Sequence, residues 1–241
     1  MRAATLARLL LVLGVAATAA RAAGIDHRVT FDDGGIWSHN TELAIMYTMI
    51  GGEVATGLWE GGESQLGKTS WQAMDSTVAG ALLAQAGKYI FTRSRPSQTP
   101  DPNMWFQGKG NYSFPSGETT TYTAIVTPYI LEYGKEYPAV YALALLPIYS
   151  GVARVKEWGH WQTDILASWA LGGVTGYWAH TRDSPLILSV MPHGVMVGGT
   201  QRRSSELGRA RKVSALVVMD RLLDLFARVH DERSVLDDRF V

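Results

Sequence analysis

The sequence predicts a mainly α-helical bundle, and two observations support this prediction. Apolar segments of helical length recur along the chain as far as residue 179. Between them lie stretches rich in glycine or proline, such as WEGGESQLGK and PSQTPDPN, which are typical of turns and loops. We therefore expect helices at about 42–58, 71–92, 119–133, 137–155 and 161–179.

The first element in chain order is an export signal. Arg2 and Arg8 give a basic start, and residues 9–20 form an apolar stretch that is too short to span a bilayer comfortably. Ala20-Arg21-Ala22 fits a cleavage site between small residues. We expect residues 1–22 to be a signal peptide and the protein to be exported, either periplasmic or secreted. An uncleaved anchor or a buried N-terminal helix is the alternative.

The apolar segments predict a soluble bundle rather than membrane spans. None offers about 20 uninterrupted apolar residues, which is the length that a span requires. Segment 139–155 comes nearest, but it is short and contains Pro147. The mean hydropathy of −0.00 is typical of a globular protein. Polar residues within or near the five segments include Glu53, Asp75, Gln85, Glu132 and Asp164.

Three further elements are predicted after the bundle. In PLILSVMPHGVMVGG, two short β-rich runs flank Pro192-His193-Gly194, which indicates a short β-hairpin. Residues 201–212 are polar and basic and are typical of a linker. Residues 213–241 would form a C-terminal amphipathic helix and tail. We expect that helix to dock on its own domain or on a second copy of the chain. The alternative is that its apolar face contacts the surface of a membrane.

The overall composition excludes several classes of function. Lysine plus arginine equals aspartate plus glutamate, at 22 each, so nothing indicates a nucleic-acid partner. Cysteine is absent, which excludes disulfides and thiolate metal sites. The composition does not predict the oligomeric state.

Two of the three stretches that carry chemistry lie before residue 118. KYIFTRSRP places Lys88 and Arg95 seven residues apart, so both are expected on one face of a helix that ends at Pro96. In FPSG, Ser116 is a good helix N-cap, and the N–H of Gly117 lies at a helix start, where an anion is favoured. Each stretch alone is common in proteins.

The third stretch, ARVKEWGHWQTD, places Arg154, His160 and Asp164 at R-x5-H-x3-D spacing. Residues four apart are neighbours on a helix. We therefore expect Asp164 to hold one ring nitrogen of His160 and to leave the other free for nucleophilic attack.

Taken in this order, the three stretches resemble the type 2 phosphatidic acid phosphatase superfamily, which includes class A bacterial acid phosphatases and vanadium haloperoxidases. The pattern of that family is K-x6-R-P, then P-S-G-H, then S-R-x5-H-x3-D, and the resemblance covers residues 88–179. Two positions differ: Ala153 replaces serine and Glu118 replaces histidine. The resemblance implies that residues 23–200 form a phosphatase domain, a helical bundle of this kind with the hairpin after its core.

The resemblance also implies an exported, metal-independent phosphatase that hydrolyses phosphomonoesters or lipid-linked phosphates and diphosphates through a phosphohistidine. It implies that hydrolysis requires no cofactor, and that vanadate would bind in the same cage, as an inhibitor or as a cofactor. The implied partner is the substrate, a small-molecule or lipid phosphate. His160 would be the nucleophile, with Asp164 fixing its tautomer. The residues implied to bind phosphate are Lys88, Arg95, Ser116, Gly117 and Arg154.

Glu118 occupies the position of the histidine that protonates the leaving oxygen in the family. Three roles stay open: an acid while protonated, a base that activates water against the phosphohistidine, or a carboxylate that caps the helix. His39 is a second candidate for the missing proton donor, although we expect it at the surface or in the core.

Two other functions stay open as alternatives. A vanadate-dependent haloperoxidase would use the same cationic cage, but the changed residue Glu118 counts against it. A non-catalytic phosphate- or phospholipid-binding protein would keep the cage without turnover. The intact pair of His160 and Asp164 counts against that function, because binding alone needs no nucleophile.

Overall fold

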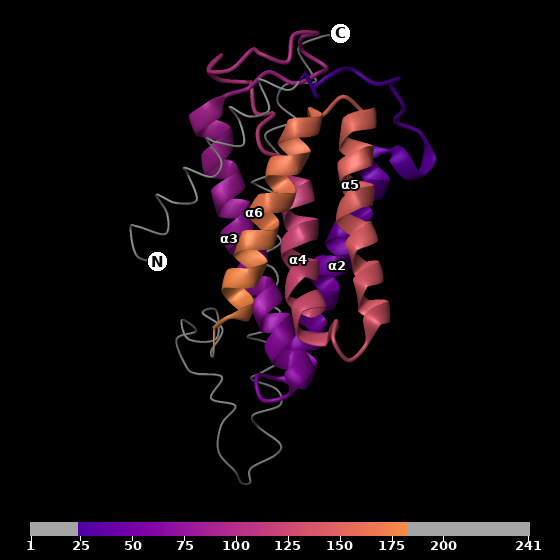
Figure 1. Cartoon of the computed structure of the whole chain (residues 1–241), viewed down its shortest axis with the longest axis vertical. Helices are drawn as coiled ribbons and strands as arrows, with labels where there is room; N and C mark the ends of the chain where they lie inside the picture. Colours follow the sequence, from indigo (N-terminus) through magenta and orange to yellow (C-terminus); the bar gives the residue numbers. More distant parts are fainter. Residues whose placement is uncertain (1–23, 183–241) are drawn as a thin grey trace, which may run out of the picture. The chain divides into compact units, whose positions relative to one another are not determined.

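Five α-helices form a bundle in the computed structural model, which describes residues 24–182 (Figure 1). No strand occurs in this described range, and the mainly helical prediction is confirmed. The expected leader, β-hairpin, linker and C-terminal helix lie outside it. The elements are η1 (Gly35–Trp37), α2 (His39–Glu60), α3 (Gln65–Phe91), α4 (Gly117–Tyr133), η2 (Pro138–Ala144), α5 (Leu145–Lys156) and α6 (Gln162–His180).

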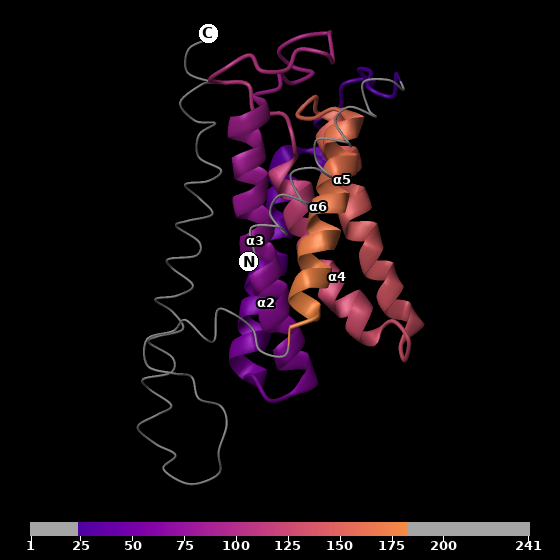
Figure 2. The same ribbon diagram turned by 60° about the vertical axis from the view of Figure 1, so that its left-hand side comes forward.

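Helix α4 lies at the centre of the bundle and packs against α2, α3, α5 and α6 (Figures 1 and 2). Tyr122 and Ala124 of α4 are fully buried. Helix α6 approaches α4 closely because Gly172 has no side chain. A Cβ atom there would lie 2.5 Å from the Cβ atom of Thr123. This contact fixes the separation of the two helices whose first turns carry the second and third stretches.

Serine residues set where three of the helices begin. The hydroxyls of Ser38, Ser64 and Ser116 each accept a hydrogen bond from the backbone N–H three residues further on. The Ser64 cap starts α3 at Gln65, six residues before the predicted start at 71. The prediction missed this turn because its residues are polar, although Thr69 and Ser70 are buried.

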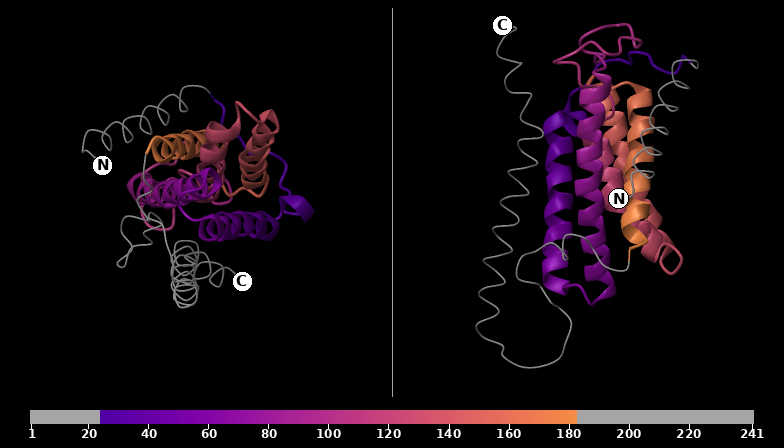
Figure 3. Two further views of the ribbon diagram at one scale, coloured as in Figure 1. Left: turned by 90° about the horizontal axis from the view of Figure 1, so that it is seen from below. Right: turned by 90° about the vertical axis from the view of Figure 1, so that its left-hand side faces the viewer.

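The segments that carry the predicted site lie together at one end of the bundle. The loop 92–116 spans this end, beside the α5–α6 connection and the segment before α2 (Figures 1 and 3). Helices α2, α4 and α6 all begin there, so the positive ends of three helix dipoles point to the same region.

One helical stretch in the described range is long and apolar enough to cross a membrane, as judged by length and composition. It is Pro138–Lys156, whose most apolar 18-residue segment has a mean hydropathy of 1.3 and is 28% buried. One such stretch is weak evidence for a membrane span, and the soluble bundle stays a prediction.

Candidate active site

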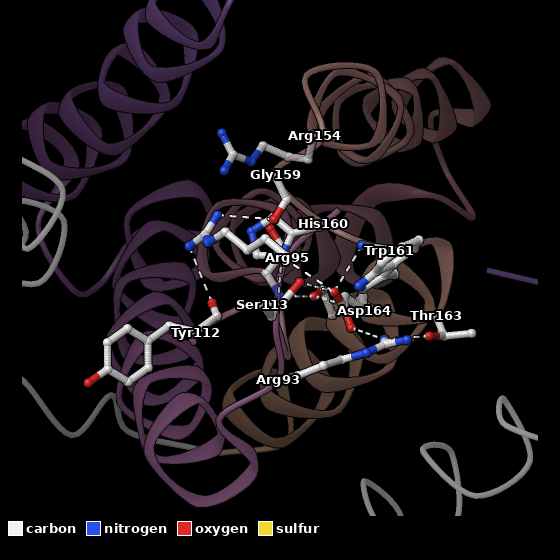
Figure 4. Close-up of polar contacts among 12 residues, drawn as sticks. Arg93, Arg95, Tyr112, Ser113, Arg154, Gly159, His160, Trp161, Thr163 and Asp164 are labelled. Atoms are coloured by element: carbon white, nitrogen blue, oxygen red, sulfur yellow. Dashed lines mark hydrogen bonds and ion pairs between the residues drawn. The ribbon is translucent and has the colours of Figure 1, made fainter. Parts of the chain in front are cut away.

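Lys88 and Arg95 meet at one backbone carbonyl. Lys88 Nζ donates to the Tyr112 oxygen at 3.0 Å, and Arg95 Nη2 donates to the same oxygen at 3.3 Å. Arg95 Nη1 also donates to the Gly159 carbonyl at 3.1 Å, which ties the first stretch to the third (Figure 4). The expected helix up to Pro96 is wrong, because α3 ends at Phe91 and Arg95 projects from the loop.

His160 is buried and presents one ring nitrogen for chemistry. Its Nδ1 lies 2.5 Å from the Ser113 carbonyl oxygen (Figure 4). A carbonyl oxygen only accepts, so Nδ1 carries the proton and Nε2 carries the lone pair. Nε2 has no hydrogen-bond partner within the described part of the chain. Burial holds the pKa of His160 well below its usual value, so the imidazole is neutral near pH 7.

Asp164 does not hold His160 directly, which corrects the expectation from the i, i+4 spacing. His160 precedes α6, and its Nδ1 lies 3.7 Å from Asp164 Oδ2. That carboxylate oxygen instead accepts from the Trp161 N–H at 2.9 Å and from the Ser113 hydroxyl at 2.5 Å. Ser113 therefore connects the pair, since its hydroxyl donates to Asp164 and its carbonyl accepts from His160.

Arg93 completes this support and was missed by the sequence reasoning. Its side chain is 1% exposed and donates to Asp164 Oδ1, to Asp26 Oδ2 at 2.6 Å and to Thr163 Oγ1 at 2.9 Å. Burial raises the pKa of Asp164, but Arg93 and the hydrogen bonds outweigh it and lower this pKa to about 2. Arg93 and Arg95 are two residues apart and bind different groups: Arg93 binds carboxylates, whereas Arg95 donates to backbone carbonyls.

The turn before α4 is built as the sequence predicts. Ser116 is the N-cap of α4: its hydroxyl accepts from the Thr119 N–H at 3.3 Å. Its own N–H donates to the Ser168 hydroxyl at 2.8 Å. Lys88 passes beside Gly117, where an added Cβ atom would lie 3.7 Å from Lys88 Cε. Because Ser116 caps the helix, Glu118 is not needed for that role.

Arg154 is fully buried at the end of α5 and is surrounded by acidic residues. Its Nη1 contacts the Glu157 carboxylate, and Nη2 lies 3.7 Å from Glu118 Oε1. Within residues 24–182, Nε and Nη2 have no hydrogen-bond partner. Gly159 leaves room for the guanidinium, because a Cβ atom at that position would lie 2.7 Å from Nη2.

Glu118 points into the same space. The Glu118 side chain is buried, and its Oε2 lies 3.8 Å from His160 Nε2. The Ser116 hydroxyl donates to the same oxygen at 3.4 Å. The carboxylate thus lies among three of the residues predicted to attack or bind phosphate.

His39 and Glu42 of α2 also reach this region. Arg154 Nη1 donates to His39 Nδ1, so the expected surface or core position of His39 is wrong. Glu42 is fully buried, and its carboxyl group accepts from the Ser150 hydroxyl at 2.7 Å. Its Oε2 lies 4.0 Å from His39 Nδ1. Burial raises the pKa of Glu42 to about 8, so this carboxyl group is protonated near pH 7. Glu42 lies outside the three stretches and gave no signal in the sequence.

No group of three or more histidine or acidic side chains in the described range is arranged to hold a metal ion. Metal independence and the role of vanadate stay predictions.

Two lipid phosphatases match part of this chain. Lipid A 1-phosphatase of Porphyromonas gingivalis is 36% identical over 113 residues, which cover 44% of this chain and 22% of that protein. Lipid A 1-phosphatase of Rhizobium etli is 33% identical over 103 residues, which cover 41% of this chain and 43% of that protein. The chain thus matches less than half the length of each relative.

Two solved structures also resemble it. A transmembrane PAP2 type phosphatidylglycerolphosphate phosphatase from Bacillus subtilis aligns with a TM-score of 0.45 and 17% identity, over 72% of this chain and 92% of that chain. LpxE of Aquifex aeolicus aligns with a TM-score of 0.39 and 16% identity, over 63% of this chain and 98% of that chain.

A family model described as the PAP2 superfamily matches residues 70–185. This range contains all three stretches, most of α3 and the whole of α4, α5 and α6. The family match therefore assigns residues 70–185, just under half of the chain, to the PAP2 superfamily.

Proposed function

We propose that this protein is a phosphatase that acts on a lipid-linked phosphate through a phosphohistidine at Nε2 of His160. One observation carries the proposal: Nε2 is buried, unprotonated and without a hydrogen-bond partner among the described residues, while Nδ1 is fixed on the Ser113 carbonyl. An imidazole held in this way is a nucleophile whose lone pair has a single direction.

In the first step, Nε2 attacks phosphorus as the bond from phosphorus to the leaving oxygen breaks. Lys88, Arg95 and Arg154 stabilise the charge on the transferring group, as fixed cations do in other phosphoryl-transfer sites. Glu118 in its protonated form gives its proton to the leaving oxygen. Water then attacks the phosphohistidine, Glu118 takes a proton from that water, and phosphate and neutral His160 are released.

Two observations support a lipid substrate. The curated relatives with 33–36% identity are both named lipid A 1-phosphatase. A stripe of apolar side chains, each 41–65% exposed, also follows η2 and α5 at helical spacing. Such a stripe suits a protein that works at or beside a membrane, and the proposed location is outside the cytoplasm. The stripe consists of Tyr137, Tyr141, Leu145, Ile148 and Val152.

The substrate class is tested by phosphate release in the presence of a chelator. The full chain is incubated with lipid A, phosphatidic acid, prenyl diphosphate and glycerol phosphate in mixed micelles. We expect release from at least one lipid at a kcat/KM at least about tenfold above that for glycerol phosphate. Equal rates on all four substrates would contradict the lipid assignment, and loss of activity with chelator would contradict the metal-independent route.

The role of Glu118 as the acid is tested by the leaving group. A nitrophenolate leaves as a weak base, whereas an alkoxide needs a proton. We expect Glu118→Gln to lower kcat for an alkyl phosphate by about 10²–10⁴-fold. The loss for nitrophenyl phosphate should stay within about tenfold. Equal losses on both substrates, with phosphoenzyme accumulating, would assign Glu118 to the water-activating step instead.

A further inference from the structure

The carboxylate of Glu118 lies beside the position that a bound anion must take. Its oxygens are 3.7 Å from Arg154 Nη2 and 3.8 Å from His160 Nε2. Both nitrogens are buried and without hydrogen-bond partners in residues 24–182. An anion oxygen that satisfies Arg154 Nη2, close to the attacking nitrogen, therefore comes next to the carboxylate of Glu118.

The charges around Glu118 determine what this proximity means. Glu42 is protonated near neutral pH, and the Glu157 carboxylate is paired with Arg154 Nη1. An anion that contacts Arg154 Nη2 and approaches His160 Nε2 therefore meets the side chain of Glu118, which lies near both nitrogens. Ionisable groups around it include Glu42 and Tyr47 of α2, Tyr122 of α4, Arg154 of α5 with the adjoining Glu157, and His160. Lys88 of α3 lies beside the neighbouring Gly117.

A shared proton resolves the repulsion between two neighbouring anions. If one proton lies between the carboxylate and a phosphate oxygen, the contact becomes a strong charge-assisted hydrogen bond. A phosphate group supplies such a proton because its second ionisation lies near neutral pH. Sulfate has the same shape and the same charge as the phosphate dianion, but it carries no proton near neutral pH.

We propose that Glu118 is a specificity-determining residue that makes the site select tetrahedral anions carrying a proton. A phosphate or phosphomonoester binds with its P–O–H group donating to Glu118, and sulfate is rejected. This inference rests on the proposed function only in taking phosphate as the ligand. It also gives the source of the proton that Glu118 needs as an acid: the substrate brings it into the site.

The proposal fixes the sign of the pH dependence. The complex holds one proton more than the ionised site and the ionised anion together, so raising the pH weakens binding. Above the second pKa of phosphate, the affinity for phosphate falls by about tenfold per pH unit. With a neutral amide at position 118, no proton is needed, and the dependence is lost.

The test measures binding of inorganic phosphate and sulfate to the full chain by calorimetry between about pH 5.5 and 8.5, a range that spans the phosphate ionisation. We expect phosphate to bind at least about tenfold more tightly than sulfate near pH 6.5, the gain that one charge-assisted hydrogen bond supports. In Glu118→Gln, sulfate should bind within about threefold of phosphate, because the repelling charge is gone. Glu118→Asp keeps the charge and should keep the preference for phosphate.

A matched control is Glu53→Gln, a buried acid of α2 beside Thr77. Burial raises the pKa of Glu53 well above its usual value, so the amide replaces an acid that is already neutral. This variant should keep the wild-type ratio of phosphate to sulfate affinity. Thermal unfolding of each variant checks that it is folded, and Glu118→Ala serves in place of Glu118→Gln if the latter is not.

Equal affinity for both anions in the wild-type protein would overturn the proposal, and so would an unchanged ratio in the folded Glu118 variants. The outcome is separable from that of the proposed function. Selectivity without phosphate release would support the proposal and contradict the phosphatase assignment. Release without selectivity would contradict the proposal alone, and so would release by a protein that binds neither anion measurably.

Discussion

Replacing His160 with alanine is expected to lower kcat by at least about 10⁴-fold, the range seen when a covalent nucleophile is removed. Phosphate and vanadate should still bind within about tenfold of the wild-type affinity, because Lys88, Arg95 and Arg154 carry the positive charge that attracts them. His160 is 0% exposed, and its Nδ1 is fixed on the Ser113 carbonyl. Steady-state kinetics on the best lipid substrate and calorimetry with vanadate measure the two quantities.

The matched control is His27→Ala. His27 is exposed, and its ring contacts the carbonyl of Ile25. This change should leave kcat within about twofold, as surface substitutions usually do. Near-normal hydrolysis by His160→Ala would rule out the phosphohistidine route, whereas parallel loss of turnover and anion binding would assign His160 to the cage instead.

Replacing Arg93 with alanine is expected to destabilise the protein by about 3–5 kcal/mol, the usual cost of removing one partner of a buried ion pair. The change leaves Asp164, which is 0% exposed, and Asp26 without their cation. Urea unfolding at pH 7 measures the loss. A cost below about 1 kcal/mol would show that water or another residue replaces the guanidinium.

The pH dependence identifies Asp164 as the cause of that loss. Its folded pKa is lowered to about 2, so its contribution to stability is present above its unfolded pKa and is lost as the pH falls. The difference between wild type and Arg93→Ala should therefore shrink toward acid pH. Arg95→Ala is the control two residues away: it should weaken phosphate binding and cost less stability than Arg93→Ala, because it leaves the ion pair of Arg93 and Asp164 intact.

The helices were predictable because each contains an apolar segment of helical length, and because a glycine or a capping serine marks some of the boundaries, such as Ser64 before α3 and Gly61 after α2. The ends were less predictable where side-chain capping or a polar buried turn decides them. Helix α3 begins at Gln65 because Ser64 caps it, and it ends at Phe91 because Thr92 adopts a left-handed conformation with φ of 34°. Neither feature changes the apolar pattern on which the prediction relied.

The residues of the candidate site were predictable only as far as spacing within a stretch could indicate them. Arg93 and Ser113 were not, because their partner Asp164 lies 71 and 51 residues away in the chain. His39 meets Arg154 across 115 residues, and no local pattern indicates that contact. The spacing of His160 and Asp164 also predicted a direct hydrogen bond between their side chains. In the structure, Asp164 lies in the first turn of α6, and its carboxylate accepts from the Trp161 N–H instead.

The phosphohistidine at His160 is tested by quenching the full chain during turnover with a labelled lipid phosphate and locating the label by mass spectrometry. We expect an acid-labile, alkali-stable phosphoryl group on Nε2 of His160, because Nδ1 is held by the Ser113 carbonyl. The label should be absent from His160→Ala. A phosphoryl group on Nδ1 or on another residue, or direct transfer to water with no labelled protein in a single turnover, would contradict this expectation.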